Sequence, residues 1–153
     1  MSLRTDIHEA VRQQKYADLE TLVARDARAV RYLVGLSYSA DEAIRGTAVK
    51  GIVFAARQHP KLVQNVVRRL VWAMNDESGT NALTAPEVIC ALAEEQPELL
   101  LPMVPDLVRL AGDEGLHEGL AKALRMIADR FPGQVGERLG KKLNRRISRR
   151  ARS

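Results

Sequence analysis

The chain has 153 residues and a formal net charge of +5, from 24 Lys and Arg against 19 Asp and Glu. This length is typical of a single domain that buries a core. We find no apolar run long enough to span a membrane and no secretory leader, so we expect a cytoplasmic protein. The one cysteine, Cys90, excludes an internal disulfide.

Apolar residues recur at steps of three and four positions, which predicts helices along the chain. The first two helices should cover about residues 6–14 and 17–24 and cap the fold as segment 1–26. The next two should cover about residues 27–37 and 41–58. The side chains expected to face inward are Ile7, Ala10, Val11, Leu19, Leu22, Val23, Val30, Leu33, Val34, Leu36, Ile44, Ala48, Ile52 and Ala55.

A threefold internal repeat is the most informative feature of the chain. Three similar strings end at Pro60, Pro97 and Pro132, and each follows an Asp-Glu pair. The distance from the Asp to the closing Pro is 19 residues in the first and third units, and the middle unit, Asp76–Pro97, has 21. A fixed period of this size predicts stacked helix pairs, here 27–60, 61–97 and 98–132, with an insertion at one edge of the middle pair.

The middle and last units continue the helical pattern. Helices should cover about residues 62–74, 84–97, 99–110 and 116–130, with Pro102 and Pro105 kinking the third of these or delaying its start. Residues 75–81 are rich in turn formers, and Thr84-Ala85-Pro86-Glu87 predicts a capping box. The inward residues should be Val63, Val66, Val67, Leu70, Val71, Met74, Val88, Ile89, Leu92, Leu124 and Ile127.

The C-terminal segment is strongly basic. Residues 138–153 hold eight Lys and Arg and no acid. Val135, Leu139, Leu143 and Ile147 fall at four-residue steps, so we predict that 133–153 forms a capping helix and tail, with Leu139 and Leu143 buried. We expect Arg145, Arg146 and Arg149 to be exposed. The candidate contacts to phosphate or acidic partners are Lys141, Lys142, Arg145, Arg146, Arg149 and Arg150.

The strings Asp41–Arg45 with Ala48 and Ile52, and Leu107–His117, resemble HEAT repeats. They are most similar to the short bacterial type grouped with phycobilin-lyase HEAT-like repeats, in which an Asp at the inter-helix turn precedes an aliphatic residue and a basic residue. The resemblance implies an all-α fold, an α-α superhelix of antiparallel helix pairs, and adaptor or scaffold work. Tetratricopeptide repeats are the alternative, but the first helices lack their Trp, Leu-Gly and Tyr positions.

The candidate partner-binding residues surround the inserted loop. They are Trp72, Asn75, Asp76, Glu77, Ser78 and Glu87. The acids and Ser78 could bind a partner or only cap loop and helix amides. Trp72 either packs in the core, the alternative that we favour, or stands exposed beside the loop as an aromatic anchor. Cys90 faces inward, which predicts a buried structural thiol.

The chain shows no pattern of catalytic, cofactor-binding or metal-binding residues. His8, His59 and His117 share no ligand motif, and no phosphate loop or nucleophile elbow is present. We therefore predict a non-enzymatic, protein-binding adaptor. The alternative is a nucleic-acid-binding protein that resembles HEAT-like DNA glycosylases only in architecture. It would use the basic C-terminal helix, with a strip formed by Arg68, Arg69, Arg109, Arg125 and Arg130.

Overall fold

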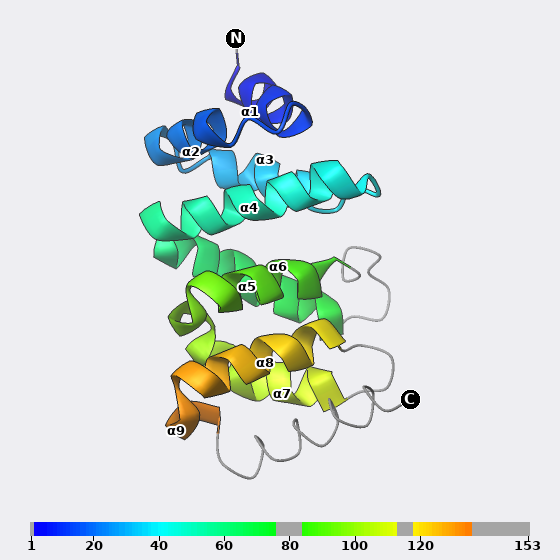
Figure 1. Cartoon of the computed structure of the whole chain (residues 1–153), viewed down its shortest axis with the longest axis vertical. Helices are drawn as coiled ribbons and strands as arrows, with labels where there is room; N and C mark the ends of the chain where they lie inside the picture. The colour runs from blue at the N-terminus through cyan, green and yellow to red at the C-terminus, as the bar shows by residue number, and fades with distance from the viewer. Residues whose placement is uncertain (1, 76–83, 113–117, 136–153) are drawn as a thin grey trace. The chain divides into compact units, whose positions relative to one another are not determined.

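A computed structural model describes residues 2–75, 84–112 and 118–135, and these residues form helices and no strand (Figure 1). The predicted all-α class is therefore confirmed for the described residues. The α-helices are α1 (Leu3–Arg12), α2 (Tyr16–Arg25), α3 (Ala29–Leu36), α4 (Glu42–Gln58), α5 (Pro60–Asn75), α6 (Ala85–Glu95), α7 (Val104–Gly112), α8 (Glu118–Arg130) and α9 (Pro132–Val135). A 3₁₀ helix, η2 (Pro97–Met103), precedes α7.

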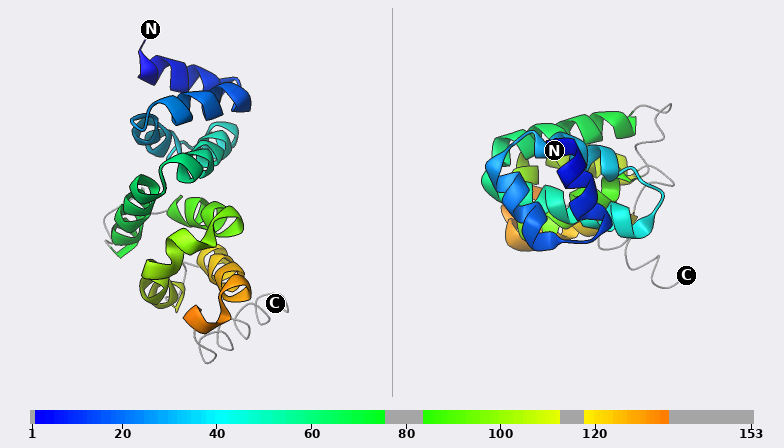
Figure 2. Two further views of the ribbon diagram at one scale, coloured as in Figure 1. Left: turned by 90° about the vertical axis from the view of Figure 1, so that its left-hand side faces the viewer. Right: turned by 90° about the horizontal axis from the view of Figure 1, so that it is seen from above.

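The chain divides into two compact units, Met1–Val66 and Val67–Ser153, and α5 contributes residues to both. In the first unit, α4 packs against α2 and α3, and α1 packs against both of these helices (Figure 1). In the second unit, α8 packs against α6, α7, η2 and α9 (Figure 2). Each unit has its own fully buried aliphatic side chains, among them Ile7, Leu19, Leu33 and Ile52 in the first and Ile89, Leu92, Leu124 and Ile127 in the second.

The start of α4 shows how its sequence fixes the turn before it. The Asp41 carboxylate accepts hydrogen bonds from the backbone N–H groups of Ala43 at 2.9 Å and Ile44 at 3.1 Å. These donors have no partner inside the helix, so an aspartate at this position stabilises the helix end. One turn later, Nη1 of Arg45 donates to the Ser39 carbonyl at 3.1 Å. The side chains of Asp41 and Arg45 therefore stabilise the turn, Asp41 at the start of α4 and Arg45 at Ser39.

The three predicted helix stops before proline share one local geometry. The backbone N–H groups of His59, Gln96 and Phe131 each donate to the carbonyl four residues earlier at 2.7 Å. His59 has φ −133° and ψ 62°, and Gln96 has φ −137° and ψ 64°. A proline disfavours helical dihedrals at the residue before it, so His59 and Gln96 are the C-caps at which α4 and α6 end. The segments that are similar in sequence are therefore also similar in how their helices end.

Pro102 and Pro105 delay the start of the helix expected at 99–110, which was one of the predicted outcomes. Residues Pro97–Met103 form the 3₁₀ helix with Pro102 inside it, and α7 begins at Val104. A proline inside an α-helix loses a backbone hydrogen bond and clashes with the preceding turn. The tighter 3₁₀ helix accommodates Pro102, and Pro105 falls in the first turn of α7, where its missing N–H costs nothing.

The core prediction is confirmed at its six key positions. Ala48, Ile52, Ile89, Leu92, Leu124 and Ile127 are all fully buried. Five residues expected to face inward are only half-buried, namely Leu22, Val34, Leu36, Ile44 and Val66. They lie at the edges of the apolar stripes, where one side of the side chain remains in contact with water.

The Thr84 half of the capping box predicted at residues 84–87 does not form. Thr84 is the N-cap of α6, but its side chain makes no capping hydrogen bond. Its backbone has φ −99° and ψ −8° instead of the extended dihedrals of a capping residue. The Glu87 N–H donates to the Thr84 carbonyl at 3.2 Å, so the donor that the Thr84 hydroxyl would have used is already satisfied.

Cys90 and Trp72 are less buried than expected. Cys90 is half-buried, and this burial raises the pKa of its thiol, with a smaller contribution from Glu94. The thiol therefore stays protonated and unreactive near neutral pH. The expectation that Trp72 packs in the core is wrong, because its side chain is 81% exposed. Its neighbours Leu70 and Val71 occupy the buried side of α5 instead.

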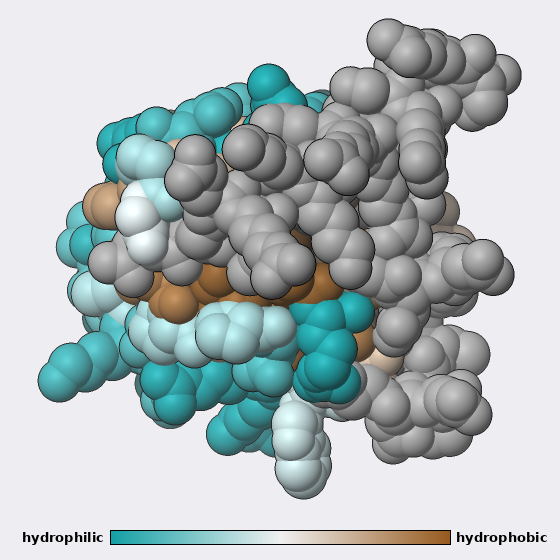
Figure 3. All heavy atoms as spheres, turned by 90° about the horizontal axis from the view of Figure 1, so that it is seen from below, coloured by the Kyte–Doolittle hydropathy of each residue, from teal (hydrophilic) through white to brown (hydrophobic). Residues whose placement is uncertain are grey.

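The predicted C-terminal cap lies mostly outside the described residues. Val135 is the last residue of α9, and residues 136–153, which include Leu139, Leu143 and Ile147, are not described. Figure 3 views the second unit from the end that carries α7, α8 and α9, and a strip of hydrophobic residues lies there beside hydrophilic ones. Coverage of this end by the basic helix stays a prediction.

An ion pair between Asp26 and Arg28 stabilises the turn between α2 and α3, and the pKa of Asp26 can be measured. Nη2 of Arg28 lies 2.7 Å from the Asp26 carboxylate, and the Arg28 N–H also donates to it at 2.9 Å. The side-chain hydrogen bond from Arg28 is the largest of the effects that lower the pKa of Asp26, from 3.8 to about 2. The folded state therefore gains stability from Asp26 above pH 3.8 and loses it as the pH falls through 2.

We expect Arg28→Ala to raise the pKa of Asp26 part of the way toward 3.8, because the largest cause of the shift is removed while the backbone N–H of residue 28 still donates to the carboxylate. Carboxyl chemical shifts recorded by NMR across an acid titration would report this pKa directly. Arg31→Ala is the matched control, since Arg31 is exposed and makes no contribution to the Asp26 shift. An unchanged low pKa in Arg28→Ala would contradict the assigned cause.

Candidate functional site

Trp72 is the most exposed large hydrophobic residue among those described. Its side chain is 81% exposed, against 38% for Tyr16 and for Leu62. Lys50 lies over the Tyr16 ring at 4.9 Å, and Arg57 lies over the Phe54 ring at 5.5 Å. Within the described residues no such cation covers Trp72. Exposed indole rings are costly in water and are common at protein interfaces, so Trp72 is the first candidate for a binding residue.

A hollow in the second unit lies beside this indole. We call it the Trp72 pocket; its volume is about 290 Å³, and its lining residues are Arg68, Val71, Trp72, Met103, Asp106 and Arg109. The first three belong to α5, Met103 ends η2, and the last two belong to α7. Val71 and Met103 are each only 4% exposed. The pocket therefore combines two nearly buried apolar residues with an aromatic ring and three charged side chains.

Of the two arginines that line the Trp72 pocket, only Arg109 has an ion-pair partner among the described residues. Nη2 of Arg109 lies 3.3 Å from a carboxylate oxygen of Asp106, one turn earlier on α7. Both side chains are more than half exposed, at 58% and 53%, so this pair contributes little to stability. Arg68 is exposed and makes no ion pair or hydrogen bond with the described residues. One guanidinium beside the exposed indole is therefore available to an incoming group.

The structure places only part of the predicted partner-binding set. Trp72 is exposed, Asn75 is the last residue of α5, and Glu87 is exposed in the first turn of α6. Asp76, Glu77 and Ser78 lie outside the described residues, as do Lys141, Lys142, Arg145, Arg146, Arg149 and Arg150. The acidic edge and the basic tail thus stay predictions.

Sequence reasoning missed the other half of the Trp72 pocket. Arg68 and Arg109 were expected only in a possible basic strip, and Val71 only in the core. Arg69, the neighbour of Arg68, does not line the pocket. Arg68 precedes Trp72 by four positions, and this spacing places two side chains on one face of a helix. That spacing could have identified Arg68, but no sequence pattern joins α5 to residues 103–109.

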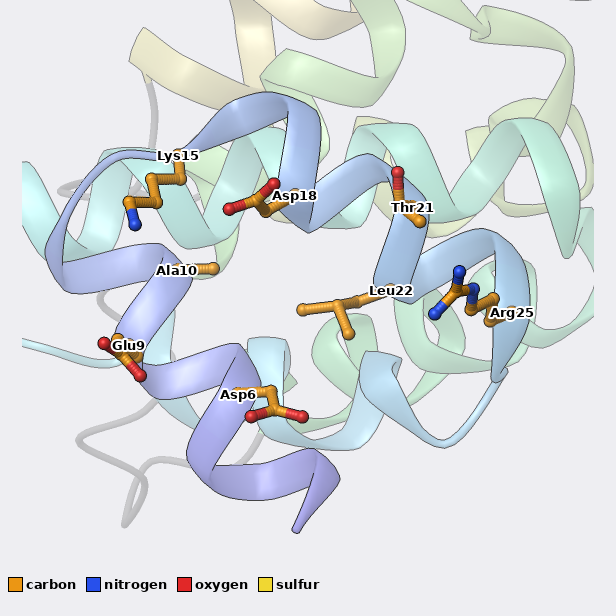
Figure 4. A pocket seen from close by; sticks show the side chains of 8 residues that line it. All are labelled: Asp6, Glu9, Ala10, Lys15, Asp18, Thr21, Leu22 and Arg25. Atoms are coloured by element: carbon orange, nitrogen blue, oxygen red, sulfur yellow. The ribbon is translucent and has the colours of Figure 1, made fainter. Parts of the chain in front are cut away.

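A second hollow lies between α1 and α2 in the first unit (Figure 4). Its volume is about 350 Å³, and its lining residues are Asp6, Glu9, Ala10, Lys15, Asp18, Thr21, Leu22 and Arg25. Lys15 and Arg25 lie at opposite ends, with Asp6 and Asp18 between them (Figure 4). The Thr21 hydroxyl donates to the Ala17 carbonyl at 3.0 Å. The one hydroxyl among these lining residues therefore donates to its own helix.

The exposed side of α1 carries a row of basic residues at four-residue steps. Arg4, His8 and Arg12 line a shallow surface together with Glu9 and Gln13. Partial burial lowers the pKa of His8 most, and the charges of Arg4 and Arg12 lower it further. His8 is therefore mainly neutral at pH 7, and only the two arginines carry charge on this row.

The other side chains that could ligate a metal or transfer a proton have structural roles or no suitable neighbours in the described part of the chain. The Nε2 atom of His59 lies 3.0 Å from the Val23 carbonyl, which ties the end of α4 to α2. Within the described ranges, no cluster of His, Cys, Asp or Glu is arranged to hold a metal ion. In the same ranges, the Oε1 atom of Gln96 is buried and has no hydrogen-bond partner. None of these groups forms a reactive pair.

Comparison with protein-family models, with characterised proteins and with solved structures gives no match. None of the helices in the described part of the chain has the length and apolar character needed to cross a membrane.

Proposed function

We propose that this protein is a non-enzymatic, protein-binding adaptor, and that it binds its partner through the surface around Trp72. The observation that carries the proposal is the 81% exposure of this indole beside the Trp72 pocket. Binding energy at protein interfaces concentrates in a few residues, and Trp and Arg are common among them. An exposed indole that lines a small hollow beside two arginines has the features of such an anchor.

We also propose that the helix pairs form a HEAT-like α-α superhelix. Three observations support this proposal. The positions aligned by the internal repeat are buried alike, as Ile52, Ile89 and Leu124 illustrate. The helices end alike before Pro60, Pro97 and Pro132. Arg45 bonds back to the turn before its helix, at the position where the resemblance has a basic residue. Solenoids of this kind commonly serve as binding surfaces.

The predicted edge residues Asn75, Asp76, Glu77, Ser78 and Glu87 belong to the same proposal, since they follow Trp72 along the chain. Acidic groups at the rim of an interface affect partner choice and association rate more than affinity. We therefore expect Trp72 to dominate the affinity and these residues to modulate specificity.

Affinity capture from an extract of the source cells tests this function. Full-length protein, Trp72→Ala and Leu62→Ala would each be immobilised, and the retained proteins identified by mass spectrometry. Leu62 is the matched control because it is an exposed apolar residue on the same helix. We expect a partner that is retained by the wild type and by Leu62→Ala and is lost from Trp72→Ala.

Trp72 is the only tryptophan of the chain, so its fluorescence provides an independent measurement. Adding the purified partner should shift the emission to shorter wavelength and protect the indole from iodide quenching, because binding removes it from water. Equal retention of every protein by all three variants, or unchanged quenching at saturating partner, would contradict the proposed function.

A further inference from the structure

The chemistry of the Trp72 pocket identifies the class of partner segment that it fits. Val71 and Met103 are the apolar residues that line the pocket beside Trp72, and each is only 4% exposed. The indole of Trp72, which is 81% exposed, supplies most of the apolar surface that a ligand can reach there. A volume of about 290 Å³ accommodates about one large side chain. The first element of recognition is therefore a single aromatic or large aliphatic side chain of the partner.

The second element is charge. Two arginines and one aspartate line the pocket, which gives it a net positive charge. Asp106 pairs with Arg109, and among the described residues no acid pairs with Arg68, so Arg68 carries the remaining positive charge. Arg68 lies one helical turn before Trp72 on α5, and residues four positions apart share a helix face. A carboxylate bound by Arg68 would thus lie next to the side chain that packs on the indole.

We propose that the Trp72 pocket binds an acidic linear segment of the partner protein, with one Asp or Glu on Arg68 and a neighbouring apolar side chain against Trp72, Val71 and Met103. This inference rests on the proposed function and adds the chemical class of the partner. A guanidinium binds a carboxylate through two parallel hydrogen bonds, which fixes the orientation of the segment as well as its charge. The Arg109–Asp106 pair is exposed enough to rearrange around it.

Two other ligand classes fit the pocket less well. A cationic group can bind an aromatic face, but here two arginines line the same hollow and repel it. Single-stranded nucleic acid binds where several aromatic rings stack successive bases along a basic groove. The Trp72 pocket offers one ring, and Asp106 would face the phosphates. An acidic peptide with one apolar side chain uses the indole together with the Arg68 guanidinium, which has no partner in the described part of the chain.

The test begins with a phage-displayed library of random peptides, selected on the full-length protein. We expect the recovered peptides to share an Asp or Glu within a few positions of an aromatic or large aliphatic residue. A fluorescein-labelled peptide from this pool would then be titrated against the protein and followed by fluorescence polarisation. We expect Trp72→Ala to weaken its binding at least about 30-fold and Arg68→Glu about tenfold or more.

Arg69→Glu is the matched control. It makes the same charge change on the adjacent exposed residue of α5, which does not line the pocket, so we expect at most about a twofold change. A peptide whose acid is replaced by Lys should bind the wild type weakly and bind Arg68→Glu better, because the exchanged charges again attract. This charge exchange distinguishes a direct contact between Arg68 and the peptide acid from long-range attraction by the overall charge of the protein.

The outcomes distinguish the two proposals. Peptides that depend on Trp72 but lack acids, with Arg68→Glu equal to Arg69→Glu, would overturn the acidic-segment proposal and leave the adaptor function standing. Peptides that bind Trp72→Ala as well as the wild type, or a library that yields no binder, would overturn both. Tighter Trp72-dependent binding of fluorescein-labelled oligouridylate than of every selected peptide would overturn both in favour of nucleic acid.

Discussion

Ile52→Ala, Ile89→Ala and Leu124→Ala should each lower the free energy of unfolding by about 2–5 kcal/mol. All three side chains are fully buried, and the internal repeat aligns them at one position of three similar segments. Removing such a side chain loses its transfer free energy and leaves a cavity that the neighbouring helices fill only in part. Urea unfolding followed by circular dichroism measures the loss for the transition of the unit that holds the residue.

Lys122→Ala is the control for Leu124→Ala, because Lys122 is exposed on the same helix two positions earlier. A surface substitution of this kind should change stability by no more than about 0.5 kcal/mol. Similar losses at Ile52, Ile89 and Leu124 would mean that the three segments share one core position. A loss below about 1 kcal/mol at any of them would mean that the alignment does not describe the packing there.

The helical core could be predicted because its signal is periodic. Val63, Val67, Leu70 and Met74 recur at three- and four-residue steps on α5, and all four are buried. The same periodicity places Trp72 off this stripe. The core assignment for Trp72 followed the apolar character of the residue type instead of its position, and so it was wrong. The helical periodicity alone predicts an exposed position for Trp72, and it is a better guide to burial here than the hydrophobicity of the residue type.

The capping box at residues 84–87 shows a different limit. The residue types match the capping-box motif, but a capping side chain also needs an extended backbone at its own position. Thr84 has helical dihedrals, and its carbonyl accepts the Glu87 N–H. Asp41, by contrast, has extended dihedrals and does cap its helix. Sequence alone cannot distinguish the two, because the approach of the preceding loop sets the backbone conformation.

The Trp72 pocket could not be predicted because its two sides are distant in the chain. Arg68, Val71 and Trp72 come from α5, whereas Asp106 and Arg109 come from α7. Hydrophobic periodicity predicts which face of each helix is buried but not which exposed residues of two helices meet at a rim. The ring was a candidate from the sequence, and its charged neighbours required the tertiary structure.

Gly51→Ala should destabilise the protein, whereas Gly46→Ala in the same helix should stabilise it. A Cβ atom added at Gly51 would lie 2.8 Å from Cδ2 of Leu33 and 3.1 Å from Cδ2 of Leu19, and a Cβ at Gly46 would meet nothing within 4 Å. Both leucines are fully buried, so they can move only by disturbing the packing around them. Overpacking of this kind costs about 1–3 kcal/mol.

Both substitutions gain about 1 kcal/mol of helix propensity, because alanine loses less backbone entropy than glycine when a helix forms. This shared term cancels when the two variants are compared, so their difference isolates the contact at Gly51. We expect Gly46→Ala to be about 1–3 kcal/mol more stable than Gly51→Ala in urea unfolding. Equal stabilities would mean that α4 does not approach Leu33 as closely as the structure has it.

A double-mutant cycle assigns the cost to its cause. In a Leu33→Ala background the atoms nearest to the new Cβ are absent, so Gly51→Ala should lose most of its destabilising effect. Leu33→Ala itself leaves a cavity and lowers stability by about 2–5 kcal/mol. The coupling between the two sites should therefore be favourable, since the added methyl group fills part of that cavity. Additive effects would place the strain of Gly51→Ala elsewhere, with Leu19 as the next contact to test.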